Sequence, residues 1–474
     1  MPIGDTLGGF IRPGYNPLLV ADAPTIGTAS SGGNLAISIA FTAPTDVGGG
    51  AITSYEATAT DTVTAAVFRA SGSSSPVTIT GLTDGQTYTV TVSATNAYGP
   101  SGISAASNSF EAVPALELWV SGYNNKGQLG VGNTTNYSSP VQVGALTDWS
   151  LLSAGYLFAL GLKTDGTFWS WGEAGVWGST GHNNTTDVSS PVQVGALTTW
   201  SHVSAGAYHG AGVRTDGKIY CWGRNAYGAL ATGDTTARSS PTQVGALTDW
   251  LKVACGYGHT LSIKTDGTLW AFGWNARGQL GDGSTTNRSS PVQIGALTTW
   301  SAIQCGQWMS LATKTDGTLW AFGEGNDGPL GQGNTTDYSS PVQVGALTTW
   351  TAQFNGGGSE TTGRTVTVKT DGTAWLWGAG NYGALGHNNT TNYSSPVQLG
   401  ALTTWSKITS TSRASAAIKT DGTLWCWGGN SYGELGTGDT TATSSPVQVG
   451  ALTTWVDLQK GAGPSWLMAL KTPS

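Results

Sequence analysis

The residues of this chain that could bind a metal or form a disulfide are few, and a repeat spaces them along the sequence. The four cysteines include no CxxC pair, which argues against a zinc site. Cys255 and Cys305 occupy one position of the repeat, and Cys221 and Cys426 occupy another. Equivalent positions of separate repeats rarely bring Cα atoms within bridging distance. The sequence therefore predicts four buried free thiols and no bound metal.

Carboxylates that could act as acids or bases also repeat. One position holds an aspartate in six copies, namely Asp165, Asp216, Asp266, Asp316, Asp371 and Asp421. General acid–base catalysis needs two carboxyl groups whose surroundings drive their pKa values apart, whereas six copies of one turn give six similar surroundings. The one match to GxSxG, GNSYG at 429–433, is a copy of a loop that repeats along the chain, and the sequence contains no HExxH or phosphate-loop motif. We therefore expect no catalytic residues, no cofactor and no enzymatic activity.

Composition limits the fold class and the partners. The chain has 474 residues, of which 71 are glycine and 21 are tryptophan, and 10% are charged. Abundant glycine, threonine, serine and valine with few helix-forming residues predict an all-β chain rich in tight turns. The net charge of −7 argues against nucleic acid as a partner, because phosphate binding needs a basic surface. We find no apolar run of membrane-spanning length and predict no signal peptide.

One phrase, SSPVQVGALTTW or a close variant, recurs at intervals of 50, 51 or 55 residues. A period near 50 with short alternating runs indicates propeller blades or a solenoid. In residues 251–300 the predicted unit has strands near 251–255, 259–264, 268–272 and 291–293, with a Thr-Asp-Gly hairpin after the second strand. The tryptophan that ends each phrase is predicted to lie in the core between units: Trp149, Trp200, Trp250, Trp300, Trp350, Trp405 and Trp455.

The pattern GxNxxGQLG followed by AGxxHxLxxKTDGxLWxWG resembles the repeat of the regulator of chromosome condensation family throughout residues 116–474. The resemblance implies a seven-bladed β-propeller and structural roles for His209 and His259. The sequences at the two ends of the propeller region predict, independently of this resemblance, how the ring closes. The last copy stops at LMALKTPS, where another hairpin strand is due, and the missing piece LELWVSGYNNKGQLG stands at 116–130. We therefore expect N-terminal and C-terminal strands to complete one blade and remove the free edges.

Two further segments precede the propeller, which we assign to residues 115–474. Residues 24–114 contain short alternating runs, and GLTDGQTYTVTVSATNAYGPSGISAAS at 81–107, with Leu82 and Tyr88, resembles a fibronectin type III domain. Phe41 stands where that family often has a core tryptophan. The resemblance implies a sandwich of two antiparallel sheets that serves as a spacer. Residues 1–23 show little periodicity and are predicted to form an extended arm that could anchor the chain.

The copies differ from one another mainly in two loops. One follows the first strand of each unit and the other follows the third, so both emerge on the same face of an up-and-down blade. The turns KTDG and GALT, which hardly change, share the other face. Aromatic residues and arginine, which often dominate binding energy, gather in the variable loops. We predict that the receptor-binding residues are Trp274, Trp308, Trp177, Tyr227, Tyr208, Tyr257, Arg224, Arg277, Tyr382, Tyr432 and Trp466, with Tyr156 and Phe158 on the same face.

The predicted architecture is typical of a protein on a virus particle that binds a host cell. It combines an arm, a spacer and a propeller with one variable face. The opening IGDTLGGFIRPGYNPL, followed at once by a fibronectin-like module, resembles the start of bacteriophage structural proteins. The resemblance implies a tail fibre or capsid-attached fibre on the virion surface, held by other virion proteins through its arm. Its propeller would bind a host-surface glycan or protein, without membrane insertion, and the chain could form a homo-oligomer.

Other functions stay open at this point. The propeller family includes a secreted inhibitor of β-lactamase, so the chain could be a bacterial protein-binding propeller outside any virion. It could also be a purely structural capsid decoration. Nucleotide exchange, the function of the family's founding member, is disfavoured by the pI of about 5.2 and by the added fibronectin-like module.

Overall fold

The structure, a computed structural model, describes residues 19–31, 34–359, 362–461 and 465–473. The chain divides into two compact units, Met1–Ala115 and Leu116–Ser474. Both are built from β-strands, and two short 3-10 turns, η1 (Gly175–Trp177) and η2 (Asn381–Gly383), are the helical elements of the described residues. No helix in this part of the chain is long and apolar enough to cross a membrane. The predicted all-β fold class is confirmed.

The N-terminal unit is a sandwich of antiparallel sheets. Burial alternates along β6 (Thr87–Asn96), so every second side chain enters the core, as the period of a strand requires. Tyr88 is fully buried there, and its hydroxyl accepts a hydrogen bond from the Thr83 amide at 3.1 Å. One sheet contains β1 (Thr25–Ser31), β2 (Ile37–Thr42) and β5 (Val77–Ile79), and the other contains β4 (Val67–Gly72), β3 (Ser54–Asp61), β6 and β7 (Gly99–Pro100), with β8 (Phe110–Glu111) paired to β6.

The sandwich core begins before residue 24. Phe41 is buried and its ring centroid lies 4.7 Å from that of Tyr55, so this phenylalanine fills the core at the position where the family often has a tryptophan. Ala21 belongs to the same core, and the Leu19 carbonyl accepts a hydrogen bond from the Gly49 amide at 2.8 Å. Residues 19–23, which the sequence placed in an extended arm, therefore pack on the sandwich. The rest of that arm, residues 1–18, lies outside the described residues.

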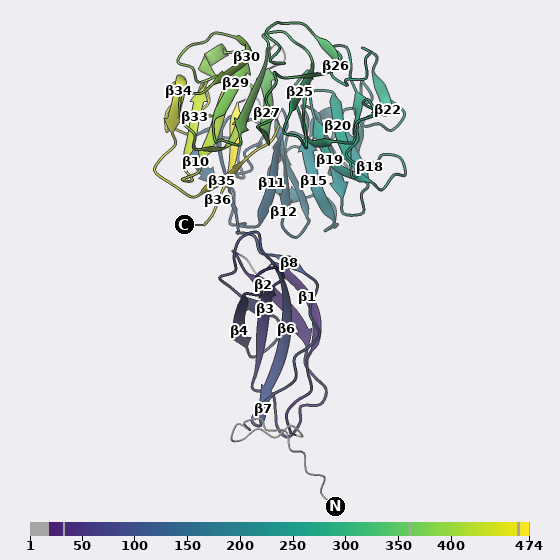
Figure 1. Cartoon of the computed structure of the whole chain (residues 1–474), viewed down its shortest axis with the longest axis vertical. Helices are drawn as coiled ribbons and strands as arrows, with labels where there is room; N and C mark the ends of the chain where they lie inside the picture. The colour runs from purple at the N-terminus through teal and green to yellow at the C-terminus, as the bar shows by residue number, and fades with distance from the viewer. Residues whose placement is uncertain (1–18, 32–33, 360–361, 462–464, 474) are drawn as a thin grey trace, which may run out of the picture. The chain divides into compact units, whose positions relative to one another are not determined.

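The C-terminal unit contains seven four-stranded antiparallel sheets among its described residues, and each sheet is one blade of the propeller (Figure 1). Six blades are continuous in sequence. Their strands, from the inner to the outer edge, are β11 (Trp149–Ala154), β12 (Phe158–Lys163), β13 (Phe168–Gly172) and β14 (Val188–Gln193); β15 (Trp200–Ala205), β16 (His209–Arg214), β17 (Ile219–Gly223) and β18 (Arg238–Gln243); β19 (Trp250–Cys255), β20 (His259–Lys264), β21 (Leu269–Gly273) and β22 (Arg288–Gln293); β23 (Trp300–Cys305), β24 (Met309–Lys314), β25 (Leu319–Gly323) and β26 (Tyr338–Gln343); β27 (Trp350–Ser359), β28 (Thr362–Lys369), β29 (Ala374–Gly378) and β30 (Tyr393–Gln398); β31 (Trp405–Ser410), β32 (Ala414–Lys419), β33 (Leu424–Gly428) and β34 (Thr443–Gln448).

The seventh blade joins the two ends of the unit and closes the ring. Its strand order is β35 (Trp455–Leu458), β36 (Trp466–Lys471), β9 (Glu117–Gly122) and β10 (Tyr137–Gln142). The register of β36 on β9 runs without a break from Trp466 opposite Gly122 to Lys471 opposite Glu117. The Lys471 ammonium lies 2.9 Å from a Glu117 carboxylate oxygen at the end of this pairing. The predicted closure by N-terminal and C-terminal strands is confirmed.

Six of the seven blades turn between their second and third strands at a KTDG or RTDG hairpin, whereas the closing blade pairs β36 with β9 from the other end of the unit. In the blade β19–β22, Asp266 Oδ1 accepts hydrogen bonds from the Thr268 amide at 2.9 Å and from the Thr268 hydroxyl at 2.7 Å. The same hydroxyl accepts a bond from the Trp270 indole N–H at 2.9 Å. Gly267 has φ +78°, and a Cβ there would lie 2.2 Å from the Thr298 carbonyl oxygen, so glycine is required. The repeated aspartates therefore organise hairpins.

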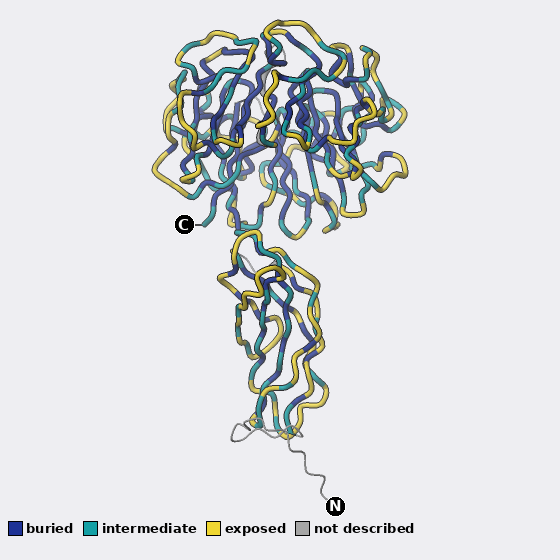
Figure 2. The backbone as a smooth tube through the Cα atoms, in the orientation of Figure 1, coloured by how far each residue is buried: buried dark blue, intermediate teal, exposed yellow. Residues whose placement is uncertain are grey.

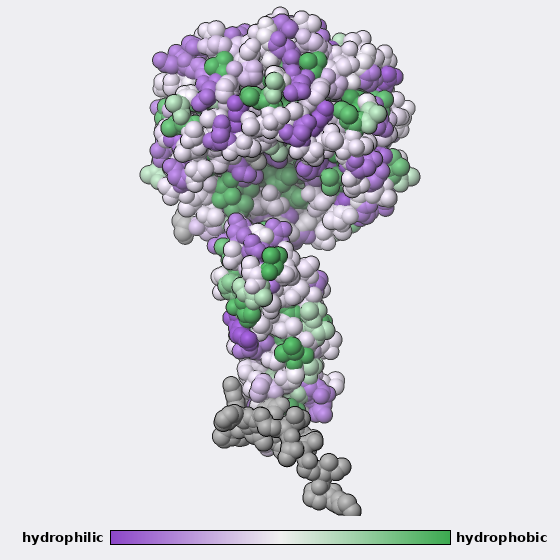
Figure 3. Space-filling model, viewed as in Figure 1, coloured by the Kyte–Doolittle hydropathy of each residue, from purple (hydrophilic) through white to green (hydrophobic). Residues whose placement is uncertain are grey.

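The propeller core lies between blades rather than within one sheet. The seven repeated tryptophans are at most 4% exposed, and Trp300 of one blade packs with Leu261, Ile263 and Leu269 of the preceding blade. Figure 2 shows the strands mostly buried and the connecting loops mostly exposed, whereas Figure 3 shows apolar and hydrophilic groups interspersed on the visible side. All four cysteines are buried and free, as predicted. Burial raises the pKa of the Cys255 thiol to about 12, which keeps it protonated at neutral pH.

In several blades the first residue of the second strand is buried in the contact between neighbouring blades. His209 and His259 hold this position, and their Nε2 atoms lie 3.0 Å from the Thr260 hydroxyl and 3.1 Å from the Ser310 hydroxyl of the next blade. Burial lowers the pKa of His209 to about 4 and that of His259 to about 3. These imidazoles are therefore neutral parts of the core, which agrees with the structural role implied by the repeat.

Replacing both core histidines is expected to make the propeller less sensitive to acid. Below about pH 6.5 the unfolded chain takes up protons on these imidazoles while the folded chain does not, so the free energy of unfolding falls as pH decreases toward 4. Each histidine contributes a slope of at most about 1.4 kcal/mol per pH unit in this window. His209→Phe with His259→Met, which copies the residues of other blades at this position, should flatten the profile measured by urea unfolding between pH 7.5 and 4.5.

A histidine in an outer loop provides the control for this experiment. His182 is half-buried near the end of a variable loop, and its pKa is lowered less strongly by burial than those of the core pair. His182→Val, which matches Val131 at the equivalent position, should change the slope less. An unchanged slope in the core double variant would contradict the assignment of these two imidazoles as buried neutral groups.

Candidate functional site

The loops that differ between copies lie at one end of every blade. In the blade β19–β22 they are residues 256–258, between the first two strands, and 274–287, between the last two. The antiparallel order places both connections at one end, and it places the hairpin at 265–268 and the GALT turn at 295–298 at the other. We name the end with the differing loops the variable face and the opposite end the copied face.

Buried asparagines hold the longer loops of the variable face in shape. Asn275 is fully buried, and its Oδ1 accepts a hydrogen bond from the Leu280 amide at 2.9 Å. Its Nδ2 donates to the carbonyls of Ser284 and Thr286, both at 3.1 Å. Trp274 precedes this asparagine directly. The side chain of Trp274 is therefore presented by a loop that is fixed from within, which lowers the entropy lost when a partner orders it.

Tyr208 is the centre of an aromatic group that crosses three blades on the variable face. Its ring centroid lies 5.5 Å from that of Tyr156, 5.3 Å from that of Trp177 and 5.5 Å from that of Tyr257. Tyr156 and Trp177 come from the two variable loops of the preceding blade, whereas Tyr257 comes from the following one. Edge-to-face and tilted pairs at these separations are favourable arrangements for aromatic rings.

Trp274, from the same blade as Tyr257, connects this group to Trp308 in a fourth blade. Its ring lies 4.4 Å from the ring of Trp308 and 5.9 Å from that of Tyr257, and it stacks on Tyr227 at 4.9 Å. Each of these side chains is half-buried, so each ring packs on its neighbours and still meets solvent. We name the continuous cluster the aromatic strip; it consists of Tyr156, Trp177, Tyr208, Tyr227, Tyr257, Trp274 and Trp308.

Arg224 is the cation of the aromatic strip. Its guanidinium carbon lies 4.9 Å from the ring centroid of Trp177 and 5.6 Å from the centroids of Tyr208 and Tyr227. A guanidinium over a ring face interacts favourably with the π electrons and keeps its N–H donors free for other acceptors. The strip therefore offers apolar ring surface around one positive donor group. The structure thus brings seven of the predicted aromatic and arginine positions, together with Tyr156, into one surface.

Arg277 is on the same face but forms ion pairs with two acidic residues of the next blade. Its guanidinium nitrogens lie 3.7 Å from Glu324 Oε1 and 3.6 Å from Asp337 Oδ2, and its side chain is 43% exposed. Burial raises the pKa of the Glu324 carboxyl, and the nearby Arg277 acts in the opposite direction. Arg277 is therefore placed to orient the loops of two neighbouring blades as well as to meet a partner.

Tyr382 and Tyr432 form two smaller groups in other blades. Tyr382 is half exposed, and the Arg413 guanidinium carbon lies 5.1 Å from its ring centroid. Tyr432 packs on Tyr123 with 4.5 Å between ring centroids. Both groups lie in variable loops, as predicted, but they are built separately from the aromatic strip. Tyr123 and Arg413 were not among the predicted residues, although both stand in the variable loops that the sequence identifies.

The prediction that Trp466 and Phe158 belong to the surface is wrong. Trp466 is fully buried in β36 and Phe158 is 1% exposed in β12. Both are the first residue of a second strand, the position that His209 and His259 occupy in other blades. The side chain at this position enters the contact between blades, so it belongs to the core. The variable loop ends one residue earlier than the sequence comparison placed it.

A second set of differing residues lines the centre of the ring, and the sequence prediction did not include it. The residue two places after each repeated tryptophan is, in chain order, Leu151, His202, Lys252, Ala302, Ala352, Lys407 and Asp457. The sequence carries the signal, because this position changes in charge from copy to copy while the residues on either side of it are uncharged in every copy. Among the described residues, no group of three or more histidine, cysteine, aspartate or glutamate side chains could hold a metal ion.

Comparison with protein families agrees with both units. The RCC1-like domain matches residues 70–363, which is more than half of the chain, and regulator of chromosome condensation repeats match 371–418 and 421–463. The fibronectin type III domain matches residues 22–110. The RCC1-like match starts inside the sandwich, whereas the first propeller strand of the structure starts at Glu117.

Curated relatives match over short stretches. The human E3 ubiquitin-protein ligase HERC2 is 32% identical over 120 residues, which are 24% of this chain and 2% of that protein. The Arabidopsis thaliana ultraviolet-B receptor UVR8 is 30% identical over 116 residues, which are 23% of this chain and 26% of the receptor. The matched stretch thus covers only a small part of each relative.

Solved structures show the same propeller fold. Human WBSCR16 has a TM-score of 0.65 at 22% identity, and the similarity covers 76% of this chain and 99% of that one. Yeast RCC1 (Prp20), in a structure with Kap60, has a TM-score of 0.67 at 16% identity and covers 76% of this chain and 89% of that one. Given the family match over more than half of its length, this chain belongs to the RCC1-like domain family.

Proposed function

We propose that the chain is a protein-binding propeller that docks its partner on the aromatic strip. The observation that carries this proposal is the continuity of the strip, in which seven half-buried rings from four blades contact one another in a chain. Three of these rings, Trp177, Tyr208 and Tyr227, also contact Arg224. Tryptophan, tyrosine and arginine are the residues most enriched among those that dominate protein interfaces. The rings already pack on one another, so a partner would order few additional rotors on binding.

The family favours a protein as the partner. Structures of the yeast propeller were determined with Kap60 and described with its binding to Gsp1p and histones. Those partners belong to the yeast protein, and we infer from them only the class of partner for this chain. Ubiquitin ligation and ultraviolet reception are not proposed here, because the matched stretches span 2% of HERC2 and 26% of UVR8.

The virion hypothesis gains no support from these comparisons. It depends on the opening residues of the chain, and residues 1–18 lie outside the described part of the structure. The family matches favour the alternative of a protein-binding propeller outside a virion. Attachment to a phage particle, and host receptor binding by such a particle, therefore stay predictions from the sequence.

Photo-crosslinking from each face of the ring tests the proposal. Val176 is 79% exposed beside Trp177 on the variable face, and Leu247 is 49% exposed in a GALT turn of the copied face. Benzoylphenylalanine would replace either residue in the full chain, which is then irradiated with a lysate of the organism that encodes it. We expect a discrete crosslinked protein from position 176 and none from position 247. Equal products from both positions, or products from position 247 alone, would contradict docking on the aromatic strip.

A further inference from the structure

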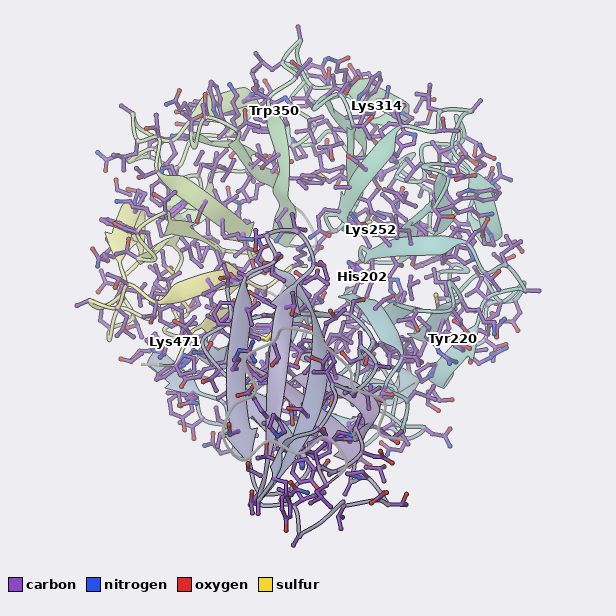
Figure 4. All side chains as sticks on the ribbon, turned by 60° about the horizontal axis from the view of Figure 1, so that its bottom comes forward. His202, Tyr220, Lys252, Lys314, Trp350 and Lys471 are labelled. Carbon is purple, nitrogen blue, oxygen red and sulfur yellow. The ribbon has the colours of Figure 1, made fainter. Side chains whose placement is uncertain are left out.

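The inner strands of the blades enclose a small cavity near their first residues, at the end of the ring that carries the copied face. Its volume is about 170 Å³, several times the share of one water molecule in the liquid, and its wall includes His202, Lys252, Gln304 and Lys460. Figure 4 shows His202 and Lys252 near the centre of the ring, whereas Lys314, Trp350 and Lys471 lie farther out. This cavity is separate from the aromatic strip, which belongs to the loops at the opposite end of the blades.

Lysine side chains lie around this cavity, although the chain as a whole is acidic, with a net charge of −7. Lys252 and Lys460 line the wall, and Lys407 stands at the position equivalent to Lys252 in another blade. Asp457 is the one acidic residue among the seven equivalent positions, and its Oδ1 lies 3.6 Å from the Lys407 ammonium. Lys252 and Lys460 have no carboxylate within ion-pair distance among the described residues, and Asp457, which pairs with Lys407, compensates the charge of Lys460 only in part.

The charged groups around the cavity shift one another's pKa values. Lys460 is an exposed residue, but desolvation of its ammonium by the surrounding protein lowers its pKa; Asp457 opposes this shift, and Lys407 and Lys252 add to it. Burial also lowers the pKa of His202 to about 3, and Lys460 and Lys252 add to that shift. Like charges held close together cost stability unless an opposite charge relieves them. A bound anion would provide that relief.

Hydrogen-bond donors and acceptors in the wall are also unsatisfied. Gln304 is 7% exposed, and its Nε2 has no hydrogen-bond partner among the described residues. The buried Nδ1 of His202 likewise has none in that part of the chain. The Lys252 ammonium donates to the Ser301 carbonyl at 3.1 Å, which leaves two of its protons for another acceptor. Buried polar groups usually have a hydrogen-bond partner, and a bound water or ion is the ordinary partner of those that have none within the chain.

We propose that this central cavity is an anion site that binds a phosphate group. Two lysines would supply charge, and the Gln304 amide would supply an oriented donor to the phosphate oxygens. Lysine acts on phosphate as a compact positive charge with several donors, so its contribution does not depend on a fixed fork geometry. The phosphate could be a free ion or a phosphorylated side chain of a partner, because both present the same oxygens.

Titration calorimetry with inorganic phosphate tests the site in the full chain at pH 7 and constant ionic strength. We expect one phosphate per chain. Lys252→Met and Lys460→Met should each weaken binding by roughly tenfold or more, since a hydrogen bond to a charged group typically contributes that much. Lys218→Met is the matched control: it removes the same charge from a copied-face turn, where Lys218 pairs with Asp216 at 3.1 Å. This variant should bind phosphate within twofold of the unchanged chain.

Two additional measurements separate binding from folding and locate the source of the phosphate. In phosphate-free buffer, Lys460→Met should melt no lower than the unchanged chain, because the substitution relieves repulsion from Lys252 and Lys407. Gln304→Leu keeps all lysines and should still weaken binding. A phosphoserine peptide that competes with phosphate would assign the site to a partner's side chain, whereas phosphate binding without peptide binding would assign it to the free ion. Absence of saturable phosphate binding, or equal loss in Lys218→Met, would overturn the proposal.

Discussion

Removal of residues 115–130 is expected to abolish cooperative unfolding of the propeller. The deletion takes away β9, the strand that pairs with β36 over six residues and with β10 on its other side. Both neighbours would then present unpaired edges, which favour association with other chains. We expect a broad, concentration-dependent transition in calorimetry and aggregation on heating, in place of one sharp transition.

The expected loss of stability follows from the apolar side chains that β9 and the loop after it bury. Leu118, Val120 and Leu129 are at most 1% exposed, and they pack with Trp149 and Trp466 across the closing blade. Truncating one buried leucine typically costs about 2–5 kcal/mol. Losing three such side chains removes about as much as the whole stability of an ordinary domain, which is about 5–15 kcal/mol.

Point substitutions provide the matched comparison for the deletion. Leu118→Ala with Val120→Ala removes buried groups of β9 and should lower the melting temperature strongly while the transition stays sharp. Leu146→Ala with Leu452→Ala removes leucines that are 38% and 40% exposed in turns of the copied face, and should change it little. If the deleted chain melts as sharply and at the same temperature as the intact one, the ring does not depend on this closure.

The architecture could be predicted because its signals are local and repeated. The Asp-Gly pair of each hairpin, the repeated tryptophan and the missing last strand are all visible in the sequence, and β9 indeed supplies that strand. Trp466 shows where this reasoning fails. Whether a residue ends a loop or begins a strand depends on one position of register, and a shift by one residue turns a strand side chain to the opposite face.

The candidate site was predictable only in part. The sequence identifies which loops vary, but the contact of Tyr208 with both Trp177 and Tyr257 joins three blades and needs the ring to be assembled. The charged lining of the central cavity was missed for a related reason. His202 and Lys252 stand far from Lys460 in the sequence, and the closed ring brings them together with this residue of the closing blade.

Replacing Trp274 and Trp308 by alanine is expected to abolish partner binding. Their rings lie 4.4 Å apart within the aromatic strip, and each also contacts Tyr257. Truncating an interface residue of this kind typically costs about 2 kcal/mol or more, and two of them together should weaken binding by at least about a hundredfold. The measurement is the affinity of each variant for the protein captured by crosslinking from position 176.

Stability must be separated from binding, because both tryptophans are half-buried. The double substitution opens space in the strip, and aromatic pairs contribute about 0.5–1.5 kcal/mol beyond their buried area, so the melting temperature should fall by several degrees. Trp270→Ala with Trp320→Ala is the matched control, since these half-buried rings lie in the same two blades near the copied face. A milder control is Thr265→Ala with Thr315→Ala, two exposed residues of the copied hairpins.

The two tryptophan pairs should lose similar stability and differ in binding. Trp270 and Trp320 face the ammonium groups of Lys264 and Lys314 at 4.4 Å and 3.7 Å, so their loss also disturbs a packed cation. If binding depends only on an intact propeller, both pairs will weaken it equally and the aromatic strip is not the docking site. If the strip is the site, the Trp270 and Trp320 variant will bind as the intact chain does at temperatures where both variants are folded, and the Trp274 and Trp308 variant will not.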